Sequence, residues 1–256
     1  MRLAALLLAL ACAATPSLAC DYPGPPPNSP EARAETGDIR WAGYSDATTR
    51  YAHGVLGDAV EAGGLRVMAG LNGPCELSVI LPEHSVFEDT GPRIADLDGD
   101  GRNEVIVVES HRDLGAALAV YGLRDGALTK LAATPNIGRT NRWLAPIGIA
   151  DLDGDGAIEI AYIDRPHLAK TLRVWRWDNG ALTEVAAGAG ATNHRIGEAD
   201  IAGGIRDCGD GPEMIVADAN WRNVLAVRLQ DGTLTSRVLF PHNGRASFTR
   251  ALACHD

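Results

Sequence analysis

The feature that most constrains this chain is a repeat of about 53 residues. Similar segments recur, each with an alternating apolar strand, an Asp-Gly or Asn-Gly turn and a second alternating strand. The turns end in Gly73, Gly126, Gly180 and Gly232, which are 53, 54 and 52 residues apart. Asp-Gly and Asn-Gly adopt the positive φ angles of tight hairpin turns. A fixed period of this length indicates one structural unit copied along the chain.

A second pair of short strands precedes each hairpin. Residues 94–96 lead to the apolar run 104–108, and residues 149–151 lead to 159–163. Four strands per repeat, with no useful helical periodicity, are typical of the antiparallel blade of a β-propeller. The sequence therefore predicts an all-β fold, a small β-propeller of about four four-stranded blades. The predicted repeats span approximately residues 38–90, 91–142, 143–193 and 194–240.

The C-terminal segment 246–254 resembles the first strand of a fifth repeat and ends where three further strands would follow. We expect it to pair with the first blade and close the ring, so that no sheet edge stays exposed. A β-sandwich of the same strands is the alternative, but repetition at a fixed period favours the propeller.

The N-terminus has the features of an export signal. Arg2 precedes an apolar run, residues 3–11, that is too short to cross a bilayer, and Ser17-Leu18-Ala19 supplies small residues before Cys20. We therefore predict a signal peptide over residues 1–19 and an exported protein, periplasmic or extracellular, without a transmembrane segment. A lipid anchor at Cys20 is the less favoured alternative, because a lipoprotein signal places Leu three residues before the Cys and Leu18 stands two before it.

A proline-rich spacer is predicted over residues 20–36, since five prolines there favour an extended, solvated chain. The propeller domain is then expected over residues 37–256. Removal of the leader leaves an even set of cysteines, which is typical of disulfides in an exported protein. These candidates, with three pairings open to them, are Cys20, Cys75, Cys208 and Cys254. Buried free thiols are the second interpretation.

The charge balance excludes one class of partner. The chain has 23 Lys and Arg against 33 Asp and Glu, a formal net charge of −10. Nonspecific binding to nucleic acid or to an anionic membrane needs a basic face. We therefore expect no nucleic-acid partner.

Two acidic loops carry the clearest chemistry in the sequence. Residues 96–104 read DLDGDGRNE, and 55 residues later residues 151–159 read DLDGDGAIE. Carboxylates at alternate positions converge if the chain curls, and an all-oxygen set of ligands suits Ca²⁺. Neither loop contains the His or Cys that Zn²⁺ requires. An EF-hand needs Glu at position 12, where the chain has Val107 and Tyr162 inside apolar strands.

These loops resemble the DxDGDGxxE loop of the FG-GAP/VCBS repeat family, whose loops bind calcium between the first two strands of propeller blades. The resemblance implies two calcium ions. Their implied ligands are Asp96, Asp98, Asp100, the Arg102 carbonyl and Glu104, then Asp151, Asp153, Asp155, the Ala157 carbonyl and Glu159. The first repeat, at residues 43–47, lacks the carboxylates. The fourth has an insertion around Cys208, where we expect a disulfide to do the clamping.

The opposite face of the predicted propeller is rich in Arg, Asn, His and Trp, which suit a carbohydrate or anionic ligand. The candidate ligand-binding residues are Arg93, His111, Arg142, Trp143, His167, Arg195 and Trp221. We rank first the alternative that Arg and Asp of neighbouring loops pair with each other and hold the blades together.

The sequence contains no nucleophile elbow, phosphate loop, zinc-protease motif or thiol redox motif. We therefore favour a secreted, calcium-binding module that recognises a protein, a carbohydrate or an anionic ligand, without catalysis. The rival hypothesis is a periplasmic hydrolase or lyase that acts on a polyanionic or carbohydrate substrate through the loop-rich face.

Overall fold

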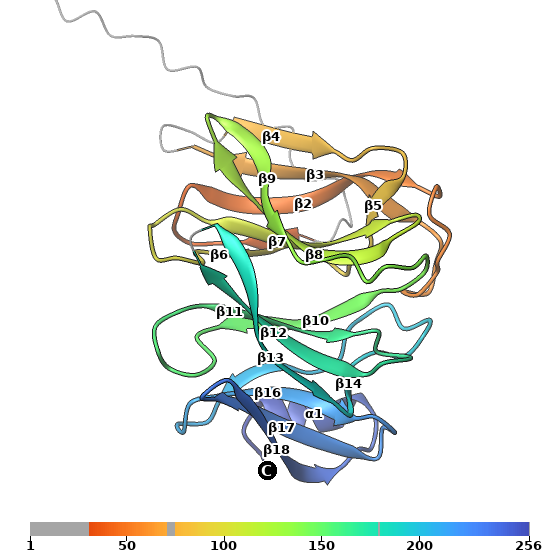
Figure 1. Ribbon diagram of the computed structural model, residues 1–256, viewed down its shortest axis with the longest axis vertical. Helices are drawn as coiled ribbons and strands as arrows, with labels where there is room; N and C mark the ends of the chain where they lie inside the picture. The colour runs from red at the N-terminus through yellow and green to blue at the C-terminus, as the bar shows by residue number, and fades with distance from the viewer. Residues whose placement is uncertain (1–30, 71–74, 179, 256) are drawn as a thin grey trace, which may run out of the picture.

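The computed structural model describes residues 31–70, 75–178 and 180–255. Across these residues the protein is all-β, with several antiparallel sheets and one short helix. The sheets lie one on another along the long axis of the molecule, with β2–β4 at one end and β16–β18 and α1 at the other (Figure 1). The all-β class is therefore confirmed.

The first sheet combines strands from the first two predicted repeats. Its members are β1 (Glu31–Arg33), β2 (Ile39–Thr48), β3 (Glu61–Ala69), β4 (Cys75–Ile80), β5 (Ser85–Phe87), β6 (Arg93–Ala95), β7 (Glu104–His111), β8 (Gly115–Arg124) and β9 (Ala127–Ala133). The short strand β5 joins the two halves, because Phe87 pairs with Ala62 of β3 and Val86 pairs with Ser110 of β7. The second repeat has the predicted four antiparallel strands, β6 to β9, and β5 links them with the strands of the first repeat into one nine-stranded sheet.

The other two sheets are smaller. The four-stranded sheet contains β10 (Leu144–Ala150), β11 (Glu159–Asp164), β12 (Thr171–Asp178) and β13 (Ala181–Ala189). The five-stranded sheet contains β14 (Ala191–Thr192), β15 (Gly204–Asp207), β16 (Pro212–Asp218), β17 (Asn223–Gln230) and β18 (Thr233–Pro241). Both are antiparallel meanders.

The hairpin turns have the backbone that the Asp-Gly pattern predicts. Between β8 and β9, Asp125 and Gly126 have φ angles of 51° and 77°. Between β17 and β18, Asp231 and Gly232 have φ angles of 50° and 69°. Two successive positive φ angles give a turn whose twist matches that of the flanking strands, so these residues fix the register of both hairpins.

The core is made of apolar layers between successive strand groups. One layer packs β2 and β3 against β7 and β8, and includes Leu65, Val107 and Tyr121. The next layers lie between β8 and β11 and between β11 and β16. Because inner strands are buried on both faces, they are continuously apolar, as in residues 105–108.

The predicted closing strand 246–254 is wrong, because these residues form the helix α1 (Arg245–Leu252). The buried residues of the helix are Ser247, Phe248 and Ala251, a helical spacing instead of the alternation of a strand. Phe248 and Ala251 pack on the face of the last sheet that the preceding sheet leaves uncovered, together with Ile215 and Ala226. The helix therefore protects the outer face of the last sheet.

The first and fourth repeats meet through their loops. The amide of Gly197 donates a hydrogen bond to the carbonyl of Val55, with 2.9 Å between N and O. Val55 is buried in the layer that also contains Leu97 and Trp143. The loop that follows β2 therefore reaches across the stack to the segment that follows β14.

At the N-terminal end, β1 pairs with β2, Ala32 opposite Ala42. Residues 31–33 therefore belong to the folded part, although the sequence places them in the spacer. The predicted signal peptide, the spacer up to residue 30 and Cys20 lie outside the described residues, and nothing is described of the Cys75 side chain. Among the described residues, no helix combines the length and the apolar character needed to cross a bilayer.

Candidate metal centres and ligand face

The first acidic loop connects β6 to β7 and is held by its own carboxylates. The Asp96 carboxylate accepts hydrogen bonds from the amides of Gly99 and Gly101, at 2.8 and 2.9 Å. Both glycines have the positive φ that this curl requires, 74° and 84°. The loop backbone therefore wraps around the first aspartate, as the predicted curl requires.

The carboxylates of the first loop converge on one point. Oxygens of Asp96, Asp98 and Asp100 lie within 4.8 Å of one another. Glu104 is buried behind them, and its Oε2 accepts a hydrogen bond from the amide of Leu97 at 3.0 Å. Burial raises the pKa of Glu104 to about 7, and the charges of the three aspartates add to this effect. The loop thus concentrates negative charge, and an all-oxygen donor set of this kind fits a hard cation such as Ca²⁺.

The second acidic loop, between β10 and β11, has the same backbone and a different charge environment. The Asp151 carboxylate accepts from the amides of Gly154 and Gly156, at 2.7 and 2.9 Å. Oxygens of Asp151, Asp153 and Glu159 lie within 4.8 Å of one another. This donor set also fits a hard cation, although Asp155 is not part of it.

Arg176 of β12 places a guanidinium among the carboxylates of the second loop. Its nitrogens lie 2.9 Å from Asp153, 2.8 Å from Asp155 and 2.6 Å from Glu159. Burial raises the pKa of Glu159, and the hydrogen bonds from the Leu152 amide and from Arg176 offset part of that rise. The second loop therefore carries its own counter-cation.

The difference between the loops arises at one cross-strand position. Arg176 is the partner of Glu159 in the pairing of β11 with β12. Beside Glu104 the chain has Gly122, where a Cβ atom would lie 3.8 Å from Glu104 Oε1. Glycine therefore leaves Glu104 without an arginine opposite it, and the guanidinium of the first loop is that of the exposed Arg102, which pairs with Asp100.

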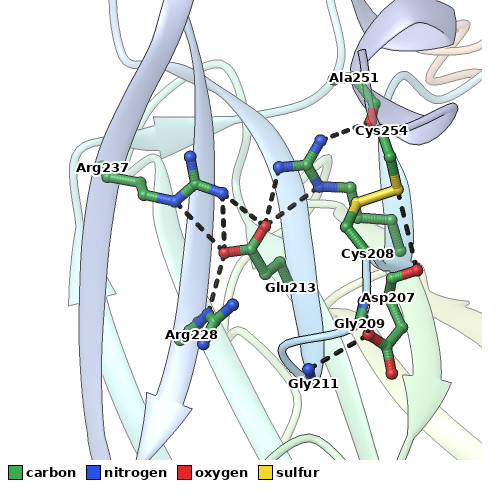
Figure 2. The surroundings of a disulfide bond; sticks show 10 residues. Asp207, Cys208, Gly209, Gly211, Glu213, Arg228, Arg237, Ala251 and Cys254 are labelled. Atoms are coloured by element: carbon green, nitrogen blue, oxygen red, sulfur yellow. Dashed lines mark hydrogen bonds and ion pairs between the residues drawn. A yellow bond between two sulfur atoms is a disulfide. The ribbon is translucent and has the colours of Figure 1, made fainter. Parts of the chain in front are cut away.

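In the fourth repeat arginines surround the closing glutamate most completely. Glu213 is 2% exposed, and its carboxylate receives hydrogen bonds from Arg206 at 2.8 Å and from Arg228 and Arg237 at 2.9 Å (Figure 2). Burial alone would raise the pKa of Glu213, but the three guanidinium hydrogen bonds lower it below its usual value. Arg228 occupies the position that Arg176 has in the third repeat.

A disulfide joins Cys208, in the insertion of the fourth repeat, to Cys254 after α1, with the Cα atoms 5.7 Å apart. We expected a disulfide at Cys208 to stabilise this turn. The bond links the β15–β16 turn to the end of the C-terminal helix, which supports that expectation. The corresponding segment of the first repeat, residues 43–47, lies inside strand β2 and forms no loop.

Residues 96–162 match the model of the FG-GAP-like repeat family. This segment contains both acidic loops. The chain therefore contains an FG-GAP-like repeat. The resemblance drawn from the two loops is confirmed for this segment.

Two solved structures resemble the chain at low identity. A crystal structure of a protein from Lactobacillus plantarum is 15% identical, with a TM-score of 0.46, over 81% of this chain and 54% of its own length. The rhamnogalacturonan lyase PL11 of Bacillus licheniformis is 17% identical, with a TM-score of 0.36, over 81% of this chain and 51% of its own. This chain spans about half the length of each. No curated protein sequence matches it.

The predicted ligand-binding residues separate into distinct groups. One cavity is lined by Arg142, Trp143 and His167. Arg195 lies over the ring of Trp221, with 4.0 Å between its guanidinium carbon and the ring centre. These two residues therefore contact each other, apart from that cavity.

The other two candidates lie elsewhere. Arg93 pairs with the buried Asp89, whose carboxylate is 2.8 Å away, and holds the start of the second repeat in place. His111 packs against His84, with 4.7 Å between the ring centres. Arg93 is thus paired with an aspartate four residues before it in the same segment.

Several residues of the cavity were missed from the sequence. His53 lines it, and its Nδ1 lies 2.5 Å from the carboxylate of Glu88. Glu88 is fully buried and also accepts a hydrogen bond from Ser110, at 2.5 Å. His53 and Ser110 are 35 and 22 positions from Glu88, so no local spacing in the sequence relates them.

Proposed function

We propose that the protein is an exported, propeller-like binding module whose tandem acidic loops hold calcium. The observation that carries this proposal is the convergence of Asp96, Asp98 and Asp100 within 4.8 Å, repeated one period later by Asp151, Asp153 and Glu159. The match to the FG-GAP-like repeat over both loops supports it. Bound calcium would neutralise the mutual repulsion of the carboxylates and stabilise the turn between two strands.

The propeller-like arrangement is supported by the repeat period, the antiparallel meanders and the contact between the first and fourth repeats through Val55 and Gly197. Export is supported by the predicted leader and by the disulfide, a bond that persists in oxidising compartments. A carbohydrate, an anionic ligand or a protein segment is the proposed partner.

The calcium role is tested by thermal unfolding. A chelator should lower the melting temperature of the purified protein, and excess Ca²⁺ should restore it, because a ligand that binds only the folded state stabilises it by mass action. Mg²⁺ at equal concentration is the matched control, since its preference for a small octahedral site fits these flexible loops less well. A melting temperature that is the same with chelator and with Ca²⁺ would contradict the proposal.

A further inference from the structure

The cavity lined by His53, Arg142 and His167 is built by all four repeats and is separate from the acidic loops. It has a volume of about 200 Å³. His53 comes from the first repeat, Arg142 ends the second, His167 belongs to the third, and Ile196 belongs to the fourth. We call this cavity the histidine pocket.

Buried partners hold the first wall of the histidine pocket in place. The carboxylate of Glu88 accepts from both His53 and Ser110, and the backbone carbonyl of Glu88 accepts from the indole N–H of Trp143 at 2.7 Å. Because the carboxylate faces Nδ1 of His53, that nitrogen carries the proton. Nε2 of His53 has no hydrogen-bond partner among the described residues, so it can accept a hydrogen bond from a ligand.

A chain of hydrogen bonds fixes the second wall. Nε2 of His194 lies 2.8 Å from the carbonyl oxygen of Glu198, which can only accept, so this nitrogen carries a proton. Nδ1 of His194 then accepts from Nε2 of His167, at 3.0 Å. This assignment leaves Nδ1 of His167 as a hydrogen-bond acceptor. Burial lowers the pKa of His167 to about 4, so the ring is neutral at pH 7.

The positive charge of the histidine pocket is concentrated on one residue. Arg165 also lines it, but the Asp164 carboxylate binds that guanidinium at 2.7 and 2.9 Å. For Arg142 the described residues provide the carbonyl of Asn141, at 2.9 Å, and no carboxylate. In a protein of net charge −10, an arginine without an acidic partner beside a cavity is suited to an anionic group of a ligand.

The edge of the pocket adds an apolar element. Leu168 and Ile196 line it and are 63% and 71% exposed. A ligand that satisfies the whole site has one carboxylate for Arg142, hydroxyl donors for the imidazole nitrogens and C–H surface for the aliphatic edge. A single planar guanidinium matches a carboxylate in two parallel hydrogen bonds.

We propose that the histidine pocket binds a hydroxylated carboxylate of the size of a single sugar acid, with Arg142 on the carboxylate and His53 and His167 on the hydroxyl groups. This inference rests on the proposed binding role and names the ligand class and the site.

The test uses D-glucuronate and D-glucose, which differ at one carbon, as matched probes in isothermal titration of the full protein with Ca²⁺ present. We expect saturable binding of one glucuronate per chain and at least tenfold weaker binding of glucose. Arg142→Ala should weaken glucuronate binding at least tenfold, and Arg142→Lys should recover only part of it because the fork is lost. Arg222→Ala, an exposed arginine outside the pocket, is the control and should bind like the wild type.

A second readout separates contact from folding. Nitrogen-15 spectra of the imidazole rings should show a shift of His53 and His167 on addition of glucuronate, with His255 unchanged. Binding of neither sugar, or equal binding by the wild type and Arg142→Ala, would overturn the inference. If calcium still stabilises the protein in that case, the proposed function stands and only the pocket assignment fails. If the calcium response is absent but Arg142-dependent binding is present, the pocket assignment stands and the proposed calcium role fails.

Discussion

The two acidic loops of this protein have almost the same sequence and different electrostatic environments. Both wrap around their first aspartate through paired glycine amides. In the first loop the closing Glu104 lies beside Gly122, whereas in the second Glu159 lies beside Arg176. The guanidinium of the first loop, the exposed Arg102, pairs with Asp100, whereas Arg176 contacts Asp153, Asp155 and Glu159 of the second loop. We therefore expect the first loop to depend more on a cation from solution.

The fourth repeat extends the comparison, because Glu213 is surrounded by three arginines and the adjacent turn is joined by a disulfide. The same structural position is thus stabilised in three ways along one chain. We infer from the comparison that the cross-strand neighbour of the closing glutamate sets how far each loop would depend on a bound cation.

The largest expected effect is at Glu213 of the fourth repeat. Glu213→Gln should destabilise the protein by about 3–5 kcal/mol, because it removes the counter-charge of Glu213 from the buried guanidinium of Arg206. The loss should be equal with Ca²⁺ and with chelator, as measured by chemical denaturation. A loss that Ca²⁺ reverses would contradict the assignment of this region to arginine.

The next effect separates the two acidic loops. Asp98→Ala should remove most of the calcium-dependent rise in melting temperature, and Asp153→Ala should remove less of it, because Arg176 already compensates the second loop. A ligand present at 100 times its Kd stabilises by about 2.7 kcal/mol, which sets the scale. Asp113→Ala, an exposed carboxylate 68% accessible, is the control. Equal losses from both variants would remove the distinction between the loops.

A third prediction exchanges metal for arginine. In chelator, Arg176→Gln should have a lower melting temperature than the wild type. Addition of Ca²⁺ should restore the melting temperature of the variant, since its second loop then depends on the ion as the first does. Calcium affinity at this loop should rise about tenfold or more. Arg173→Gln is the matched control, because Arg173 is on the same strand and pairs with Asp164 and Glu184 instead. An unchanged calcium response in Arg176→Gln would refute the role of the guanidinium.

The last prediction concerns Glu61, a buried glutamate with no arginine partner among the described residues. Burial raises the pKa of Glu61 to about 8. Because the folded-state pKa lies above the ordinary value of 4.5, the stabilising contribution of Glu61 is full below about pH 4.5 and is lost as the pH rises through about 8. Glu61 borders a cavity of about 780 Å³.

Glu61→Gln should therefore flatten the decline of stability between pH 5 and 8 and make the protein more stable than the wild type at pH 8.5. Denaturant titrations across this range test it. A steeper decline in the variant would show that the charge of Glu61 is compensated in the folded state.

Much of this arrangement is predictable from local sequence. The acidic loops and the Asp-Gly hairpins are determined by residues within nine positions of one another, so Asp96–Glu104 and Asp125–Gly126 could be interpreted correctly. The disulfide at Cys208 was predicted because the fourth repeat has an insertion around this cysteine in place of the regular series of carboxylates.

The missed features depend on longer-range contacts. Strand β5 joins two repeats through single pairs such as Phe87 with Ala62, which no period encodes. Segment 246–254 has a composition compatible with either state, and burial of Phe248 and Ala251 against the last sheet selects the helix. The arginine at position 176 is meaningful only once the register opposite Glu159 is known.

The central claim is that calcium and arginine substitute for one another at the same structural position. Isothermal titration of calcium into the decalcified protein tests it most directly. We predict two sites whose affinities differ at least tenfold, the tighter one lost in Asp98→Ala and the weaker one strengthened in Arg176→Gln. Two sites of equal affinity that Arg176→Gln leaves unchanged, or no calcium binding at all, would contradict the account.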